Sequence, residues 1–184
     1  MGIIKRKRLF LDTEFTSLDK KSQLLSIALY ESNEKYFYGE VTDYDKLAIN
    51  SWVRENVISK FILESAPKNM EIKYEGAMTY SDLENKLKLW FTKYYSKTQV
   101  HICADNYTWD WLHFCELYQG ARNLPANIHY MPIDLATLLY AKGYDMDAKR
   151  SELAREIQKG VILDAHSALS DARAAQIIFN HITK

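Results

Sequence analysis

RLFLDTEF, at residues 8–15, decides the fold, because it is a short run of apolar, β-favouring residues that carries two carboxylates near its end. LLSIALY at residues 24–30 and KYFYGEV at residues 35–41 follow it at hairpin spacing. Ser17 and Asp19 mark the first turn. The three runs together predict a three-strand meander at the start of the chain.

Helical and strand patterns alternate after the meander. Leu83, Leu87 and Trp90 recur at spacings of three and four behind a Thr79 or Ser81 cap, which is typical of an amphipathic helix. The sequence predicts helices over residues 51–61, 81–95, 108–118, 135–141, 151–158 and 167–181, strands over 99–104 and 128–130, and a loop over 65–80. The chain begins with three strands and then alternates between helices and strands, with no linker or internal repeat. This order indicates one α/β domain over residues 1–184.

The composition excludes several classes of protein. Of 184 residues, 47% are hydrophobic and only 3 are Pro and 6 Gly, so the chain is not disordered, collagen-like or of low complexity. No apolar stretch has the length of a membrane span or a signal peptide, and we therefore expect a compact cytoplasmic protein. Lys plus Arg and Asp plus Glu each number 24, so any polyanionic partner must be held by a local site.

The two cysteines lie in a repeated pattern that suggests zinc. His101 precedes Cys103 by two positions and His113 precedes Cys115 by two, and both residue types are zinc ligands. Side chains two positions apart on a helix point in nearly opposite directions, however, and the second pair lies in a predicted helix. We therefore expect buried thiols and ordinary histidines rather than a zinc site.

Asp12 and Glu14 lie at the end of the first predicted strand. Because side chains alternate along a strand, both carboxylates project from the same face. Crowded anions demand either a raised pKa or a cation, and Mg²⁺ prefers carboxylate oxygens. Asp82 and Glu84 repeat the spacing within a predicted helix, where a solvated first turn is the better interpretation.

The sequence HSALSD at residues 166–171 supplies a histidine next to a carboxylate. If Ser167 caps the last helix, Asp171 lies one turn inside it and His166 directly precedes it, an arrangement that suits a base that activates water. His129 and Asp134 have the same spacing, but the proline between them forbids the helical geometry. We interpret that second pair as structural.

DNYTWD at residues 105–110 follows the fourth predicted strand and opens a helix. Asp110 falls in the first turns of that helix, where a purely capping role is the alternative. Each of the three acidic motifs lies at the end of an element, where one edge of a sheet can gather them. Their conjunction favours a catalytic site over three separate structural roles.

These motifs resemble the DEDD superfamily of 3′-to-5′ exonucleases, in its histidine-containing branch. The resemblance rests on DTEF at residues 12–15, NYTWD at 106–110 and HSALSD at 166–171, and small bacterial and phage exoribonucleases are the most similar members. Asp105 stands where many members have histidine, and Ser26 where many have an acidic residue; both departures bear on substrate preference more than on catalysis. The resemblance implies a ribonuclease H-like fold, a mixed five-stranded sheet with helices on both faces.

The resemblance also implies roles for individual residues. Four carboxylates would hold two divalent cations, Mg²⁺ or Mn²⁺; these are Asp12, Glu14, Asp110 and Asp171. His166 would be the base that takes the proton of a water molecule. The substrate would be the 3′ end of a single-stranded nucleic acid, RNA more than DNA, and the products nucleoside 5′-monophosphates. The substrate-binding residues would be Thr13, Phe15, Leu18, Asn106 and Trp109.

Other interpretations stay open at this stage. A metal-dependent endonuclease of the same fold would use similar carboxylates, and a nucleic-acid-binding module without activity would retain them. Trp109 could belong to the core instead of the substrate site, since large aromatic side chains dominate cores. A homodimer is one possible assembly.

Overall fold

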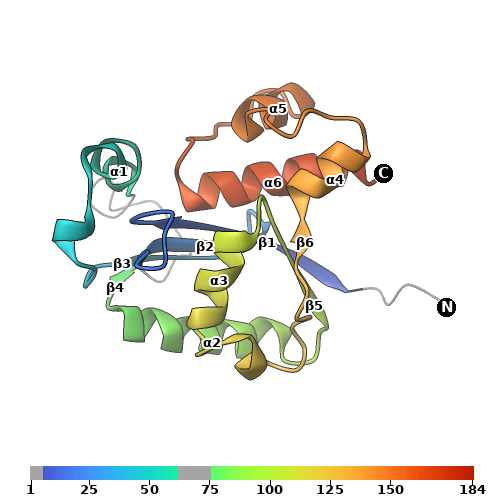
Figure 1. Ribbon diagram of the computed structural model, residues 1–184. Coiled ribbons are helices and arrows are strands. Elements are labelled where there is room, and N and C mark those ends of the chain that lie inside the picture. The colour runs from blue at the N-terminus through green and yellow to red at the C-terminus, as the bar shows by residue number, and fades with distance from the viewer. Residues whose placement is uncertain (1–5, 62–75) are drawn as a thin grey trace.

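A six-stranded mixed sheet forms the centre of the computed structural model, which describes residues 6–61 and 76–184 (Figure 1). The strands are β1 (Lys7–Phe15), β2 (Leu24–Ser32), β3 (Lys35–Val41), β4 (Gly76–Met78), β5 (Val100–Ala104) and β6 (Ile133–Asp134). The α-helices are α1 (Ser51–Asn56), α2 (Tyr80–Tyr95), α3 (Thr108–Glu116), α4 (Leu135–Ala141), α5 (Arg150–Ile157) and α6 (Ala168–Ile182). Short 3₁₀ turns cover Lys46–Ala48, Ile58–Lys60 and Ala121–Asn123.

The order of the strands is β4-β3-β2-β1-β5-β6. β1 pairs antiparallel with β2, and β2 with β3, so the predicted meander is confirmed. β5 and β6 join the other side of β1 in parallel, and β4 runs parallel to β3. This α/β arrangement is compatible with the ribonuclease H-like fold.

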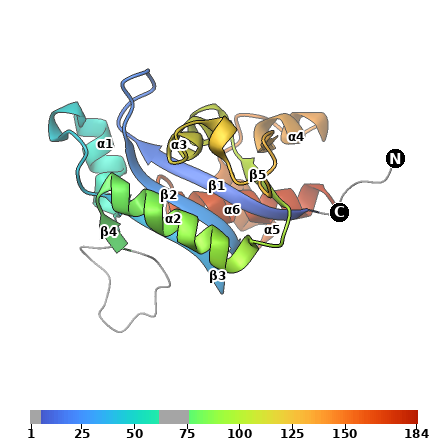
Figure 2. The same ribbon diagram turned by 90° about the horizontal axis from the view of Figure 1, so that it is seen from below.

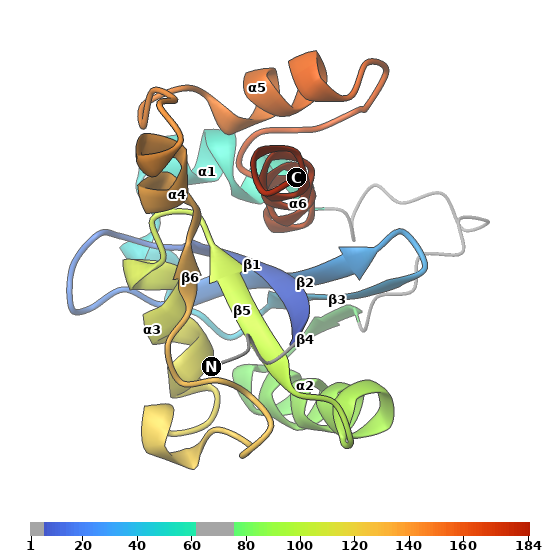
Figure 3. The same cartoon turned by 90° about the vertical axis from the view of Figure 1, so that its right-hand side faces the viewer.

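The helices form one layer on each face of the sheet (Figure 3). Leu9 and Leu11 of β1 point into a core that includes α2 and α3, and Figure 2 shows these two helices on that face. Phe10, between them in sequence, points into the opposite core with α4, α5 and α6. No helix in the described residues is long and apolar enough to cross a membrane.

The predicted five strands become six, and one of the predicted strands is wrong. Ile128 makes only an isolated bridge to Val100, and the chain then leaves β5 before Pro132, which has no N–H to donate. It pairs again as β6, at Cys103 and Ala104. The additional strand β4 lies in the predicted loop 65–80, the rest of which, up to residue 75, falls outside the described residues.

Most predicted helices are observed with ends that differ by one or two residues. Thr79 caps α2, because its side-chain oxygen accepts the N–H of Asp82 at 3.2 Å. The predicted helix 51–61 is shorter than expected: α1 ends at Asn56, and a 3₁₀ turn follows it. Val53 and Val57 of this segment pack against Leu25 of β2 and so fix α1 beside the end of the meander.

Candidate active site

The end of β1 presents its alternating side chains to two different layers. Phe10 belongs to the core under α6, so the even-numbered Asp12 and Glu14 continue on that face of the sheet. Thr13, between them, is directed toward the opposite layer and its hydroxyl contacts α3. A single strand therefore positions groups for both sides of the site.

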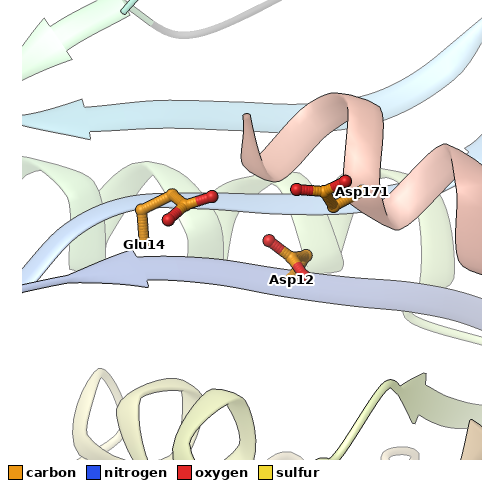
Figure 4. Close-up of side chains that lie close together, drawn as sticks. All are labelled: Asp12, Glu14 and Asp171. Atoms are coloured by element: carbon orange, nitrogen blue, oxygen red, sulfur yellow. The ribbon is translucent and has the colours of Figure 1, made fainter. Parts of the chain in front are cut away.

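Three carboxylates meet between β1 and α6 (Figure 4). Oxygens of Asp12, Glu14 and Asp171 all lie within 4.8 Å of one another. Asp171 is in the first turn of α6, where its side chain accepts a hydrogen bond from the backbone N–H of His166 at 2.8 Å. Among the described residues, these three side chains form the single group of three or more His, Cys, Asp or Glu side chains whose ligand atoms lie this close together.

Asp110 approaches the cluster from α3, on the other side of the sheet. Its Oδ1 accepts two hydrogen bonds from Thr13, one from the N–H at 2.9 Å and one from the hydroxyl at 2.6 Å. These bonds hold the carboxylate, which is 6% exposed, at the edge of β1. Asp110 lies outside the 4.8 Å group but close enough to raise the pKa values of Asp12 and Glu14.

Burial is the main reason why all four carboxylates have raised pKa values. Burial and then the charge of Asp110 raise the pKa of Asp12 well above its ordinary range. Burial and then Asp171 raise the pKa of Glu14 to about 8. The pKa of Asp110 is raised to about 7 despite the bonds from Thr13, and that of Asp171 to about 6 despite the backbone N–H groups it accepts.

The donor set fits hard divalent cations. Carboxylate oxygens are the ligands that Mg²⁺ and Mn²⁺ prefer, and Asp12, Glu14 and Asp171 offer them at a common point. Without a cation, crowding and burial keep these carboxyl groups from all being ionised at neutral pH; a cation removes the repulsion between their ionised forms at the same time as it gains its ligands. The cluster can therefore hold positive charge against a phosphodiester.

His166 stands at the mouth of this cluster in an unusual backbone conformation. Its φ is +60°, in the left-handed region that few non-glycine residues adopt. The ring is exposed and meets the edge of Trp52 from α1, with the ring centres 4.9 Å apart. His166 lines two cavities, one with Glu14 and the other with Asp12 and Asp171.

The cavity beside Glu14 is largely apolar and has a volume of about 390 Å³. Phe15 and Leu18 line it from the end of β1, and Trp52 and Val53 line it from α1. Leu18 is 73% exposed and Trp52 53%, so both present large apolar surfaces to solvent. Trp52 was not predicted as a site residue. A large aromatic side chain among the exposed polar residues of a short helix is the feature that points to it.

The other predicted substrate residues have varied environments. Phe15 stacks on His113 at 5.3 Å between ring centres and lies 6.0 Å from Trp109. Trp109 is half-buried, so its burial alone does not decide between a substrate-binding role and a place in the core. Asn106 is exposed, with φ of +48°, and Thr13 is engaged by Asp110.

The second cavity, about 400 Å³ in volume, has charged walls. Asp105 lies in its wall, and its Oδ2 is 2.9 Å from Nε of Arg150 at the start of α5. Burial raises the pKa of Asp105, and the charge of Arg150 opposes that shift. Sequence spacing gives no sign of this ion pair, because 45 positions separate its partners.

The residues interpreted as structural lie elsewhere. Asp134 caps α4 by accepting the N–H of Thr137 at 3.0 Å, while His129 interacts with the backbone of Met131. Cys103 and Cys115 are buried free thiols. These contacts agree with the sequence-based interpretation of these residues.

The chain is similar to two curated proteins over nearly its full length. It is 25% identical over 176 residues, 96% of this chain and 93% of the relative, to the 3′-5′ exoribonuclease MT2234.1 of Mycobacterium tuberculosis strain CDC 1551 / Oshkosh. The same identity and coverage hold for the 3′-5′ exoribonuclease Rv2179c of strain ATCC 25618 / H37Rv. No family model matches the chain. The similarity supports a nuclease of that kind.

Proposed function

We propose that this protein is a metal-dependent 3′-5′ exonuclease that removes nucleoside 5′-monophosphates from single-stranded nucleic acid, preferably RNA. The observation that carries the proposal is the convergence of Asp12, Glu14 and Asp171 beside His166, between two cavities. The similarity to two exoribonucleases supports the direction of cleavage and the preference for RNA.

Asp12, Glu14, Asp110 and Asp171 would hold two divalent cations. Such cations lower the pKa of a water molecule and stabilise the negative charge that develops on the leaving oxygen. His166 accepts the proton of the attacking water, whose oxygen bonds to phosphorus as the bond to the 3′ oxygen of the preceding nucleotide breaks, and that 3′ oxygen takes up a proton from solvent. The terminal nucleotide then leaves as its 5′-monophosphate.

The position of His166 suits this transfer of a proton. The hydrogen bond from its backbone N–H to Asp171 fixes the backbone of His166, and the edge contact with Trp52 holds the ring at the mouth of the cluster. Because the ring is exposed, the proton can pass on to solvent. The side chain therefore lies next to the carboxylates without being one of their buried partners.

The apolar cavity suits the base of the terminal nucleotide. Phe15, Leu18 and Trp52 offer flat or apolar surfaces that any base can contact. Stacking on aromatic side chains contributes about 1–3 kcal/mol per base and tolerates every sequence. A pocket that holds one unpaired base selects an end of a single strand over an internal position of a duplex.

The direction of cleavage tests this proposal. We expect a linear single strand with a 5′ label to shorten through a ladder of products in Mg²⁺ or Mn²⁺, and a circular strand of the same sequence to persist. Matched RNA and DNA strands measure the preference between them. Internal fragments released from the circle would instead identify an endonuclease.

A further inference from the structure

The charged cavity adjoins the reacting groups on the side of Asp12 and Asp171, while the apolar cavity adjoins them at Glu14. His166 lines both. The reacting groups of the proposed function therefore lie between two cavities of different character. Lys149 and Arg150 line the charged cavity, whereas the described residues that line the apolar one include no lysine or arginine.

Arg150 is engaged by the protein itself. Its Nη2 donates to the carbonyl of Met146 at 2.8 Å, and its Nη1 donates to the carbonyl of Ala148. Its Nε faces Asp105, directly after β5. The guanidinium thus ties the segment before α5 to the end of β5, and it is a positioning group for that segment.

Lys149 has a different environment from its neighbour. Its side chain is 76% exposed, and its Nζ lies 3.0 Å from Oε1 of Glu152, which is itself 60% exposed. Exposed ion pairs of this kind contribute little to stability, so the ammonium can exchange Glu152 for another anion at small cost. The segment held by Arg150 therefore presents one available cation at the wall of the charged cavity.

A single strand bound as proposed must continue past the reacting groups. With its terminal base in the apolar cavity beside Glu14 and the scissile phosphate at the carboxylates, the next phosphate on the 5′ side would lie on the side of Asp12 and Asp171, where the charged cavity adjoins them. The two proposed cations would neutralise the four carboxylates at the scissile phosphate, and the chain has no net positive charge to attract the next phosphate. A local cation at this position would supply that attraction.

We propose that Lys149 contacts the phosphate that lies one position upstream of the scissile phosphate, and that the Arg150–Asp105 ion pair positions the segment that carries Lys149. This inference rests on the proposed function.

The test pairs a protein variant with a substrate variant. Lys149→Ala is compared with the parent on two single strands that differ only at the upstream linkage, which is either a phosphate or an uncharged methylphosphonate. We expect the parent to show a three- to fivefold higher KM for the methylphosphonate strand, about the size of one partly exposed ion pair. Lys149→Ala should show that higher KM on both strands, with kcat close to the parent value.

Two further measurements separate this inference from the proposed function. The equilibrium binding of the same strands is measured by fluorescence anisotropy in chelator, and there Lys149→Ala should reduce the dependence of log affinity on log salt by about 0.7. Strands that bind with this coupling but are not cleaved after Mg²⁺ or Mn²⁺ is supplied would overturn the proposed function and leave the phosphate contact standing. Equal losses with the methylphosphonate in parent and Lys149→Ala would overturn the contact.

Two variants provide controls. Lys159→Ala removes the same charge from an exposed position beyond α5 that does not line the cavity, and it should leave KM and the salt dependence unchanged. Arg150→Gln should weaken the coupling to the upstream phosphate, and the double variant with Lys149→Ala should lose no more coupling than Lys149→Ala alone. A lower melting temperature for Arg150→Gln with the coupling intact would show that the ion pair only stabilises the fold.

Discussion

Asp12 is the most crowded carboxylate of the site, because it interacts with Asp110, Asp171, Glu14 and Asp105. We expect Asp12→Asn to raise the free energy of unfolding in chelator at neutral pH by about 1–2 kcal/mol, since the amide carries no charge and needs no proton at this buried, crowded position. Activity should fall by orders of magnitude in the same variant. Urea unfolding in chelator checks the first expectation, and a clearly destabilised variant would make Asp12 a structural residue.

His166 is distinguished from the other histidines by its position at the mouth of the cluster. As the proposed base, it should lose about 10²- to 10⁴-fold in kcat when changed to Ala, and divalent cations should still bind because the carboxylates remain. His129→Ala is the matched control, since in the described residues that side chain contacts the backbone of Met131 and the rings of His101 and Tyr130. Near-parental turnover by His166→Ala at saturating metal would remove the histidine from the mechanism.

The positions of Asp12 and His166 in the fold follow from local rules, and their catalytic roles stay predictions. Alternation along β1 is enough to place Asp12 and Glu14 on one face, and the spacing from His166 to Asp171 is enough to place both at the start of α6. Trp52, Lys149 and Arg150 were missed. Their roles depend on which loops meet across the sheet, and no local period carries that information.

At the scale of elements, the bond between β1 and α3 deserves a direct test. Thr13→Val keeps the shape of the side chain but removes the hydroxyl that donates to Asp110, leaving that buried carboxylate with the Thr13 N–H alone. We expect a loss of about 1–3 kcal/mol in the free energy of unfolding at neutral pH, measured with urea. The exposed Thr42→Val serves as the control, and equal stabilities of the two variants would contradict the proposed role of the bond.

The errors in the predicted elements also have physical causes. The segment 128–130 has a strand-like composition and does lie along β5, but Pro132 interrupts the ladder, so the regular pairing begins only at Ile133. β4 is three residues long, too short for any period to appear. The long amphipathic helix α2 and the meander were predictable because their hydrophobic periods extend over many residues.

For the whole molecule, the raised carboxylate pKa values predict an unusual dependence of stability on pH. Glu14, Asp110 and Asp171 have pKa values of about 8, 7 and 6 in the folded, metal-free protein, above the ordinary values near 4 of the unfolded chain. The folded state therefore binds more protons, so their stabilising contribution is complete below about pH 4 and is lost as the pH rises through 6 to 8.

We therefore expect the melting temperature in chelator to fall between pH 5 and pH 8. A loss of ~2 kcal/mol over this range corresponds to roughly 4–8 °C for a chain of this size. Saturating Mg²⁺ should reduce the fall, because cations stabilise the ionised carboxylates. A melting temperature that rises between pH 5 and pH 8 in chelator would show that the carboxylates are not crowded as described.

The proposed nuclease activity requires a divalent cation, and removing and then restoring that cation tests the requirement. Pure protein is stripped of metal with excess chelator, incubated with a 5′-labelled single-stranded RNA, and then supplied with Mg²⁺ or Mn²⁺ above the chelator concentration; Asp171→Asn is treated in parallel. We expect an intact strand in chelator, a ladder of shortened products once the cation is added, and no such recovery for Asp171→Asn. Undiminished shortening in chelator, or full recovery by Asp171→Asn, would contradict this requirement.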